Sequence, residues 1–228
     1  MTTPPAVTFD VYSALLDSRT GGSRALAARV RADGLAIDPE ELFGRWDRRN
    51  KRLHRTTSPF ASFRQLAHDA MRQVFDEVGL DGDPARATED LLASMRDWPA
   101  WPDVDEGLRT VARQHRVALL SNIDDDLLAA TEVCPWVEQR ITSAQVRVYK
   151  PHAGIYRAAR QRLGDDLVHV PASARDTRGA LEAGMRVVRV RRPGHHVDPD
   201  GPRPDHEVDD LRELPGVLAS LPAPGMPA

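Results

Sequence analysis

Polar residues stand at or just after the ends of four short apolar runs in this sequence. They are Asp10, the pair Ser121 and Asn122, Lys150, and the pair Ser173 and Asp176. Carboxylates, a lysine and hydroxyl groups are residue types that serve as nucleophiles and as general acids or bases. The pattern therefore favours a catalytic site.

Each of these residues also has an ordinary structural explanation when it is taken alone. Asp10 interrupts an otherwise apolar segment and could be a structural cap or a buried acid with satisfied hydrogen bonds. Lys150 could be a solvated surface lysine. However, the carboxyl ends of parallel strands meet at one crevice, where ligands bind. Four such ends with polar residues therefore predict a shared site.

Strand-like and helix-like segments alternate around these polar residues. The expected strands are 7–12, 117–120, a piece within 141–148, 167–170 and 187–190. The expected helices are 103–112, capped by Asp103 or Asp105, then 126–131, 155–163 and 176–183, the last closed by Gly184. This alternation predicts an α/β fold with a Rossmann-like parallel sheet.

The segment between the first two strands has helical spacing only. Its three apolar stripes are Leu26, Ala27 and Val30, then Phe43, Trp46 and Leu53, then Leu66, Met71, Val74, Phe75 and Val78. We therefore expect a helical cap at 17–98, inserted after the first strand, and a core domain formed by 1–16 and 99–228.

Composition favours a cytoplasmic protein. The chain has 228 residues and a formal net charge of -3, so its overall charge suggests neither a nucleic-acid partner nor a membrane surface. No apolar stretch approaches the roughly 20 residues of a membrane span. Cys134 is the only cysteine, which excludes an internal disulfide. His195 and His196 lack a third ligand at metal-site spacing, so no metal site is expected.

Four motifs in order resemble those of the haloacid dehalogenase-like (HAD) hydrolase superfamily. They are Phe9-Asp10-Val11-Tyr12, Leu120-Ser121-Asn122, Tyr149-Lys150-Pro151, and His169 through Asp176 followed by Gly179 and Gly184. The resemblance covers essentially the whole chain, including the helical insertion after the first motif. It implies a Rossmann-like core with a helical cap and an aspartate nucleophile.

Within that superfamily, the chain resembles the L-2-haloacid dehalogenases more than the phosphatases. A carboxylate that attacks a phosphate dianion meets like-charge repulsion, so phosphatases recruit Mg²⁺ and place an acid two residues after the nucleophile. Here that residue is Tyr12, and Pro171-Ala172 replaces the Gly-Asp pair of the fourth motif. The dehalogenases share the tyrosine, the shorter fourth motif and a tyrosine at the position of Tyr156.

The resemblance implies a metal-independent hydrolase for a small anionic 2-haloacid. Asp10 would displace the leaving group and form an ester, and Lys150 would keep Asp10 ionised. Ser121 and Asn122 would hold the substrate carboxylate, with Tyr12 and Tyr156 as further substrate-binding residues. Ser173 and Asp176 would orient Lys150 and the hydrolytic water.

The chain departs from the dehalogenase pattern at several positions. Ala14, Pro171 and Ser173 stand where the subgroup carries threonine, serine and asparagine, and Asp47 follows Trp46 where it carries the arginine that binds the halide. Arg45 and Arg48, at neighbouring helical positions, are the candidates for that role.

Two other functions remain open at this point. One is an Mg²⁺-dependent phosphatase of small metabolites, which is the only one of these hypotheses that requires a cofactor. The other is a non-catalytic binding protein that kept the fold. The related family also suggests a homodimer.

Overall fold

The computed structural model describes residues 5–131, 133, 135–204 and 206–222. The chain divides into two compact units, and each is described by itself. The first comprises Met1–Leu16, Ala100–Ser121 and Cys134–Ala228, and the second comprises Asp17–Pro99 and Asn122–Val133. The single cysteine at position 134 lies outside the described residues. Among those described, none of the helices combines the length and the hydropathy that a membrane span requires.

The first unit is built on a six-stranded sheet in which every neighbouring pair is parallel. The strands are β1 (Ala6–Phe9), β2 (Val117–Ser121), β3 (Gln139–Thr142), β4 (Leu167–Val170), β5 (Arg186–Val190) and β6 (His206–Val208), in the order β3-β2-β1-β4-β5-β6. β1 is central, and the strand order reverses beside it, where such sheets bind ligands. The predicted α/β fold with a parallel sheet is confirmed.

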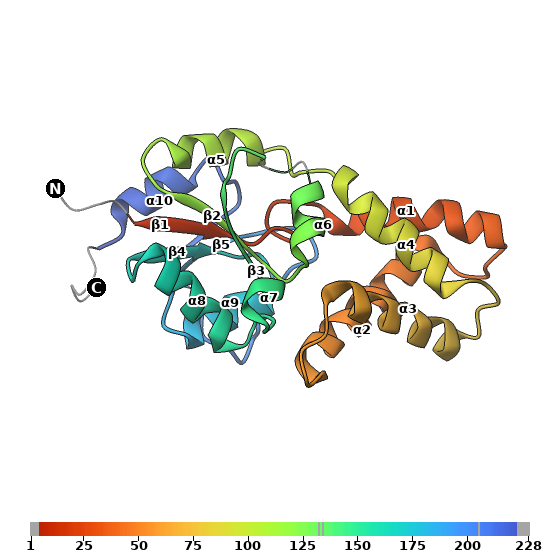
Figure 1. Cartoon of the computed structure of the whole chain (residues 1–228). Coiled ribbons are helices and arrows are strands. Elements are labelled where there is room, and N and C mark those ends of the chain that lie inside the picture. Colours follow the sequence, from red (N-terminus) through yellow and green to blue (C-terminus); the bar gives the residue numbers. More distant parts are fainter. Residues whose placement is uncertain (1–4, 132, 134, 205, 223–228) are drawn as a thin grey trace. The chain divides into compact units, whose positions relative to one another are not determined.

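Helices cover both faces of this sheet (Figure 1). They are α5 (Val104–Ala112), α7 (Ser143–Val146), α8 (Ala153–Leu163), α9 (Ala174–Glu182) and α10 (Leu214–Ser220). α5 and α10 pack together on one face, and α8 and α9 lie on the other. Apolar residues of α8, such as Ile155 and Leu163, join Leu120, Leu167 and Val187 of the strands in one buried cluster. This burial fixes α8 and α9 against the sheet.

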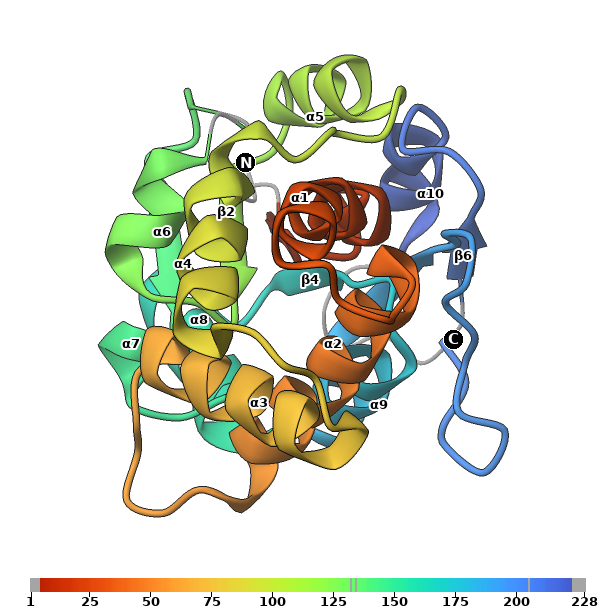
Figure 2. The same ribbon diagram turned by 90° about the vertical axis from the view of Figure 1, so that its right-hand side faces the viewer.

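The second unit is helical. It contains α1 (Ser18–Asp33), α2 (Pro39–Thr56), α3 (Phe63–Val78), α4 (Pro84–Ser94), the short 3₁₀ helix η1 (Met95–Asp97) and α6 (Asp125–Ala130). α1 packs on α2 and α4, and α3 packs on the same two helices (Figure 2). The N-caps Asp38, Ser62 and Asp83 bind the first free N–H groups of α2, α3 and α4.

Asp124 explains why residues 122–133 belong to the helical unit. Its two carboxylate oxygens accept hydrogen bonds from the N–H groups of Phe63 and Arg64, both at 2.9 Å. These N–H groups begin α3 and have no partner within that helix. The segment that follows β2 is therefore fastened to α3 by a second cap.

Several local expectations were wrong. Residues 143–146 form the helix α7, because Thr142 Oγ1 accepts the N–H of Gln145 and turns the chain after β3. β1 ends at Phe9 and not at residue 12. Asp103 occupies the N-cap position of α5, but its carboxylate binds Arg192 and the N–H of Leu211 instead of the helix. β6 and α10 were not predicted from the sequence.

Candidate active site

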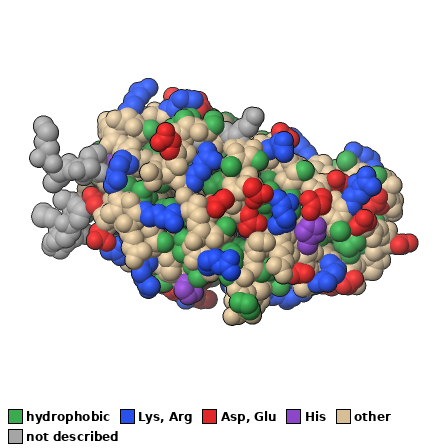
Figure 3. All heavy atoms as spheres, viewed as in Figure 1, with side chains coloured by type: hydrophobic (Ala, Val, Ile, Leu, Met, Phe, Trp, Pro, Cys, Tyr) green, Lys and Arg blue, Asp and Glu red, His purple; other side chains and the backbone are tan. Residues whose placement is uncertain are grey.

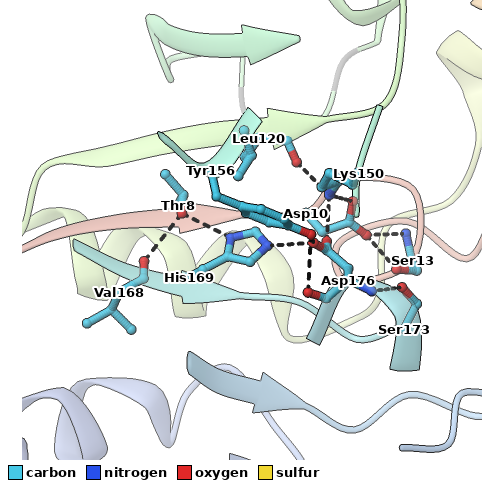
Figure 4. A network of polar contacts seen from close by, with 10 residues as sticks. All are labelled: Thr8, Asp10, Ser13, Leu120, Lys150, Tyr156, Val168, His169, Ser173 and Asp176. Carbon is cyan, nitrogen blue, oxygen red and sulfur yellow. Dashed lines mark hydrogen bonds and ion pairs between the residues drawn. The ribbon is translucent and has the colours of Figure 1, made fainter. Parts of the chain in front are cut away.

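Asp10 is the first residue after β1. Its N–H donates to Val170 O of β4 at 3.1 Å, which fixes the start of the following turn. Its Oδ2 accepts hydrogen bonds from Ser13 N–H at 3.2 Å and from Ser13 Oγ at 2.5 Å. The turn after the strand thus orients the carboxylate with its own donors (Figure 4).

Lys150 is buried, with 4% of its side chain exposed. Its Nζ lies 2.7 Å from Asp10 Oδ1, 2.5 Å from Asp176 Oδ2 and 2.9 Å from Leu120 O. An ammonium group has three protons, and each of these acceptors can take one of them. Lys150 is therefore a structural link between two carboxylates and the end of β2, and the solvated surface lysine is excluded.

Asp176 lies in the first turn of α9. Ser173 is the N-cap of this helix, and its Oγ accepts the N–H of Asp176 at 3.4 Å. Asp176 Oδ1 accepts a hydrogen bond from the hydroxyl of Tyr156 at 2.7 Å, while Oδ2 faces Lys150. Ser173 thus fixes the backbone of Asp176, and Tyr156 and Lys150 fix its carboxylate.

Tyr156 is fully buried on α8, and its hydroxyl points at α9. Gly179 allows α9 to approach it, because a Cβ at this position would lie 2.8 Å from Tyr156 Oη and 2.5 Å from Pro151 Cβ. Burial raises the pKa of Tyr156, and the charge of Asp176 raises it further. Tyr156 therefore stays protonated and acts as a donor to Asp176.

The charges of this cluster stabilise one another. Burial lowers the pKa of Lys150, but Asp10 and Asp176 raise it by more, so the pKa lies above its ordinary value. Burial raises the pKa of Asp176, but Lys150 and then His169 lower it by more, so the pKa lies below its ordinary range. Lys150 and Asp176 are therefore both ionised at neutral pH.

Ser121 and Tyr12 belong to the same unit as this cluster. Ser121 ends β2 and is 1% exposed, and none of the described residues offers its Oγ a hydrogen-bond partner. Tyr12 lies two residues after Asp10 and is partly exposed. Asn122 is also partly exposed and opens the segment that belongs to the helical unit.

Arg45 and Arg48 lie on α2 in the second unit. Arg45 forms an ion pair with Glu41 at 2.8 Å and lies 3.7 Å from Glu77, whereas Arg48 is exposed. Glu77 also pairs with Arg49, so acids neutralise much of the basic run on α2. On the face seen in Figure 3, basic and acidic side chains are interspersed and form no single charged patch.

Two residues of the cluster were missed by the sequence reasoning. Ser13 binds Asp10. The sequence feature that could have indicated this role is its hydroxyl group, one residue before Ala14, the position at which the related family carries threonine. His169 is buried within β4 and lies 3.2 Å from Asp176. Its signal was a single polar residue in the otherwise apolar run 167–170.

The cluster lacks the ligand set of a divalent cation. Among the described residues, no three His, Cys, Asp or Glu side chains are arranged to hold a metal ion. Lys150 Nζ pairs with one oxygen of Asp10 and one of Asp176, so an ammonium group already compensates part of the charge of both carboxylates.

No family model matches the chain. The (S)-2-haloacid dehalogenase 4A of Burkholderia cepacia is 28% identical, over 94% of this chain and 94% of its own length. The (S)-2-haloacid dehalogenase of Pseudomonas sp. (strain YL) is 27% identical, over 91% of each chain.

Solved structures agree with these relatives. A crystal structure of a dehalogenase superposes with a TM-score of 0.81 at 26% identity and covers 97% of this chain and 100% of that one. The L-2-haloacid dehalogenase of Xanthobacter autotrophicus with chloropropionic acid covalently bound has a TM-score of 0.83 at 21% identity, over 96% of this chain and 100% of that one, and shares the fold. In sequence and in fold, the chain is similar over nearly its whole length to the L-2-haloacid dehalogenases of the haloacid dehalogenase-like hydrolase superfamily.

Proposed function

We propose that this protein hydrolyses the carbon–halogen bond of a small 2-haloacid through an ester on Asp10. The observation that carries the proposal is the Lys150 ammonium, which holds Asp10 and Asp176 at once and leaves Asp10 beside a fixed positive charge. The relatives of the chain carry the names of enzymes for this reaction.

The first step is nucleophilic substitution at the carbon next to the substrate carboxylate. A carboxylate oxygen of Asp10 forms a bond to this carbon, and the carbon–halogen bond breaks with its electron pair leaving on the halide. Ser121 is placed to bind the substrate carboxylate, since its buried hydroxyl has no partner among the described residues. Asn122 and Tyr12 complete the proposed substrate contacts.

The second step is hydrolysis of the ester. Water adds to the carbonyl carbon of the Asp10 ester, and the acyl C–O bond then breaks. One water proton ends on the hydroxyl of the 2-hydroxy acid, and the other is released. Lys150 and Ser13 each donate to one oxygen of Asp10, so a donor is in place for the negative charge that develops on the carbonyl oxygen.

This reaction needs no metal ion. The carbon under attack carries a halogen and no anionic oxygens, so the reacting centre lacks the repulsion that a phosphate dianion presents. Lys150 supplies the positive charge beside Asp10. The phosphatase alternative would require Mg²⁺, for which the described residues assemble no group of three carboxylate, imidazole or thiolate ligands.

We further propose that residues 17–98 form the cap of this enzyme and that Arg48 binds the departing halide. Arg45 is held by Glu41 and Glu77, whereas Arg48 has no ion pair among the described residues. The homodimer remains a prediction.

The test is halide release from L-2-chloropropionate, measured with Mg²⁺ and with a chelator beside phosphate release from an aryl phosphate. We expect halide release that the chelator does not change. Turnover in ¹⁸O-labelled water should place the label in the Asp10 carboxylate, because water attacks the protein carbonyl. Mg²⁺-dependent phosphate release without halide release would contradict the proposal.

A further inference from the structure

His169 is a buried polar residue that the proposed mechanism does not use. It lies on β4, opposite Thr8 of β1 and Val187 of β5, with none of its surface exposed. Tyr156 of α8 and Asp176 of α9 face the ring from the helices that cover this side of the sheet. Burying an imidazole costs free energy unless both its nitrogens find partners.

The two ring nitrogens face different groups (Figure 4). Nδ1 lies 3.0 Å from Thr8 Oγ1, and Nε2 lies 3.2 Å from Asp176 Oδ1. The second contact has the distance of an ion pair but lacks the alignment of a hydrogen bond. Because a carboxylate oxygen offers only lone pairs, a proton on Nε2 is favoured in every state of the ring.

The Thr8 hydroxyl can serve a neutral or a positively charged ring. It can donate its proton to Nδ1, which then carries none. It can also donate to Val168 O at 3.4 Å and accept a proton from Nδ1. Rotation of one hydroxyl therefore lets His169 gain or lose a proton while both nitrogens keep their partners.

A second positive charge would balance this cluster. Asp10 and Asp176 carry two negative charges against the single positive charge of Lys150. An anionic substrate adds another negative charge. Of the side chains that face His169 from β1, β5, α8 and α9, only Asp176 is charged at neutral pH, and it links the ring to Lys150 and Asp10.

We propose that His169 is a positioning residue of the proposed haloacid hydrolase. With its Nε2 proton it holds Asp176 ionised and turned toward Lys150, and with its second proton it compensates the charge of the incoming substrate. It acts through Asp176. The proposal rests on the proposed function for its kinetic consequence, and its structural part can be measured without turnover.

The first experiment is NMR of the imidazole nitrogens in ¹⁵N-labelled protein, which needs no substrate. Nε2 should carry a proton at every pH at which the protein stays folded, because it faces the Asp176 carboxylate. A ring with its only proton on Nδ1 would overturn the proposal. The assignment is made by loss of the signals in His169→Gln.

The second experiment compares the pH profiles of His169→Gln and His169→Phe with that of the wild-type protein. His169→Gln keeps a donor for Asp176 but cannot take up charge. Its kcat/KM for L-2-chloropropionate should therefore depend on pH less steeply than that of the wild type, with a raised KM and a smaller change in kcat. His169→Phe should lose more activity than His169→Gln.

His115→Gln is the matched control, because His115 Nδ1 contacts Pro5 O at 3.0 Å and belongs to no part of the cluster. It should keep the wild-type profile. A wild-type profile in His169→Gln, or equal activity of the Gln and Phe variants, would overturn the proposal. If the wild-type protein releases no halide, the proposed function fails, and the NMR result still decides whether His169 has the protonation states described.

Discussion

Lys150 Nζ lies 2.7 Å from Asp10 Oδ1, and the two residues are 140 positions apart in the chain. Both side chains are buried, and Asp176 completes the group on the other side of the ammonium. Removal of one member of such a buried group leaves an uncompensated charge, which is strongly destabilising.

Replacing Asp10 by Asn should abolish halide release while the protein remains folded. Asn has the same shape but is a poor nucleophile, so we expect a loss on the order of 10⁴-fold or more in kcat. Ion chromatography measures the halide, and circular dichroism checks the fold. Asp105→Asn is the matched control, since Asp105 is an exposed partner of Arg109. Retained turnover in Asp10→Asn would disprove the nucleophile assignment.

Replacing Lys150 by Met should destabilise the protein. Removal of the ammonium leaves Asp10 and Asp176 as uncompensated buried carboxylates, which costs roughly 3 to 5 kcal/mol. Urea unfolding at neutral pH measures this loss. The double variant with Asp176→Asn should recover part of it, because one of the two negative charges is then gone. No recovery would mean that the loss comes from packing and not from charge.

Stability should fall in acid partly because of Asp176. Its pKa is lower in the folded state than in the unfolded chain. Its contribution is therefore complete above the unfolded value of about 3.9 and is lost as the pH falls toward the folded value. Urea unfolding between about pH 5 and pH 3 should show a steeper loss for the wild type than for Asp176→Asn. Equal slopes would contradict this.

Ser13→Ala should reduce kcat. The variant keeps the backbone N–H that binds Asp10 Oδ2 but loses the hydroxyl donor. We expect a decrease of roughly 10²-fold, the lower end of the range for loss of one donor to a developing oxyanion. Ser220→Ala, at a serine that binds only the carbonyl of Val217 in its own helix, serves as the control. An unchanged kcat would show that the Ser13 hydroxyl does not replace the threonine hydroxyl that the related family carries at the position of Ala14.

Arg48→Ala and Arg45→Ala should differ in their effects. If Arg48 binds the halide, its loss should raise KM roughly tenfold, the equivalent of one charge-assisted hydrogen bond. Arg45→Ala breaks an ion pair with Glu41 on the surface of α2 and should change KM little. Steady-state halide release checks both. The opposite order would assign the halide to Arg45.

The sequence by itself determined a parallel sheet, without its edge strand β6, and the residues at its carboxyl edge. The apolar runs before Asp10, Ser121 and Asp176 indicate buried strands, because the apolar character of a segment can be seen in its own sequence. Gly179 likewise indicates a close approach of two segments, and Gly184 indicates a left-handed turn. These signals were sufficient for the α/β class and for most of the cluster.

Only the tertiary structure decided which of these groups touch and what else joins them. Local patterns carry no information about contacts between distant segments, so the three bonds of Lys150 and the approach of His169 to Asp176 could not be derived. Strand β3 ends at Thr142, and helix α7 takes up residues 143–146 of the segment where a strand was expected, because the side chain of Thr142 caps the helix. Ser13 became a partner of Asp10 because the turn after β1 folds back on the carboxylate, a geometry that depends on the packing around it.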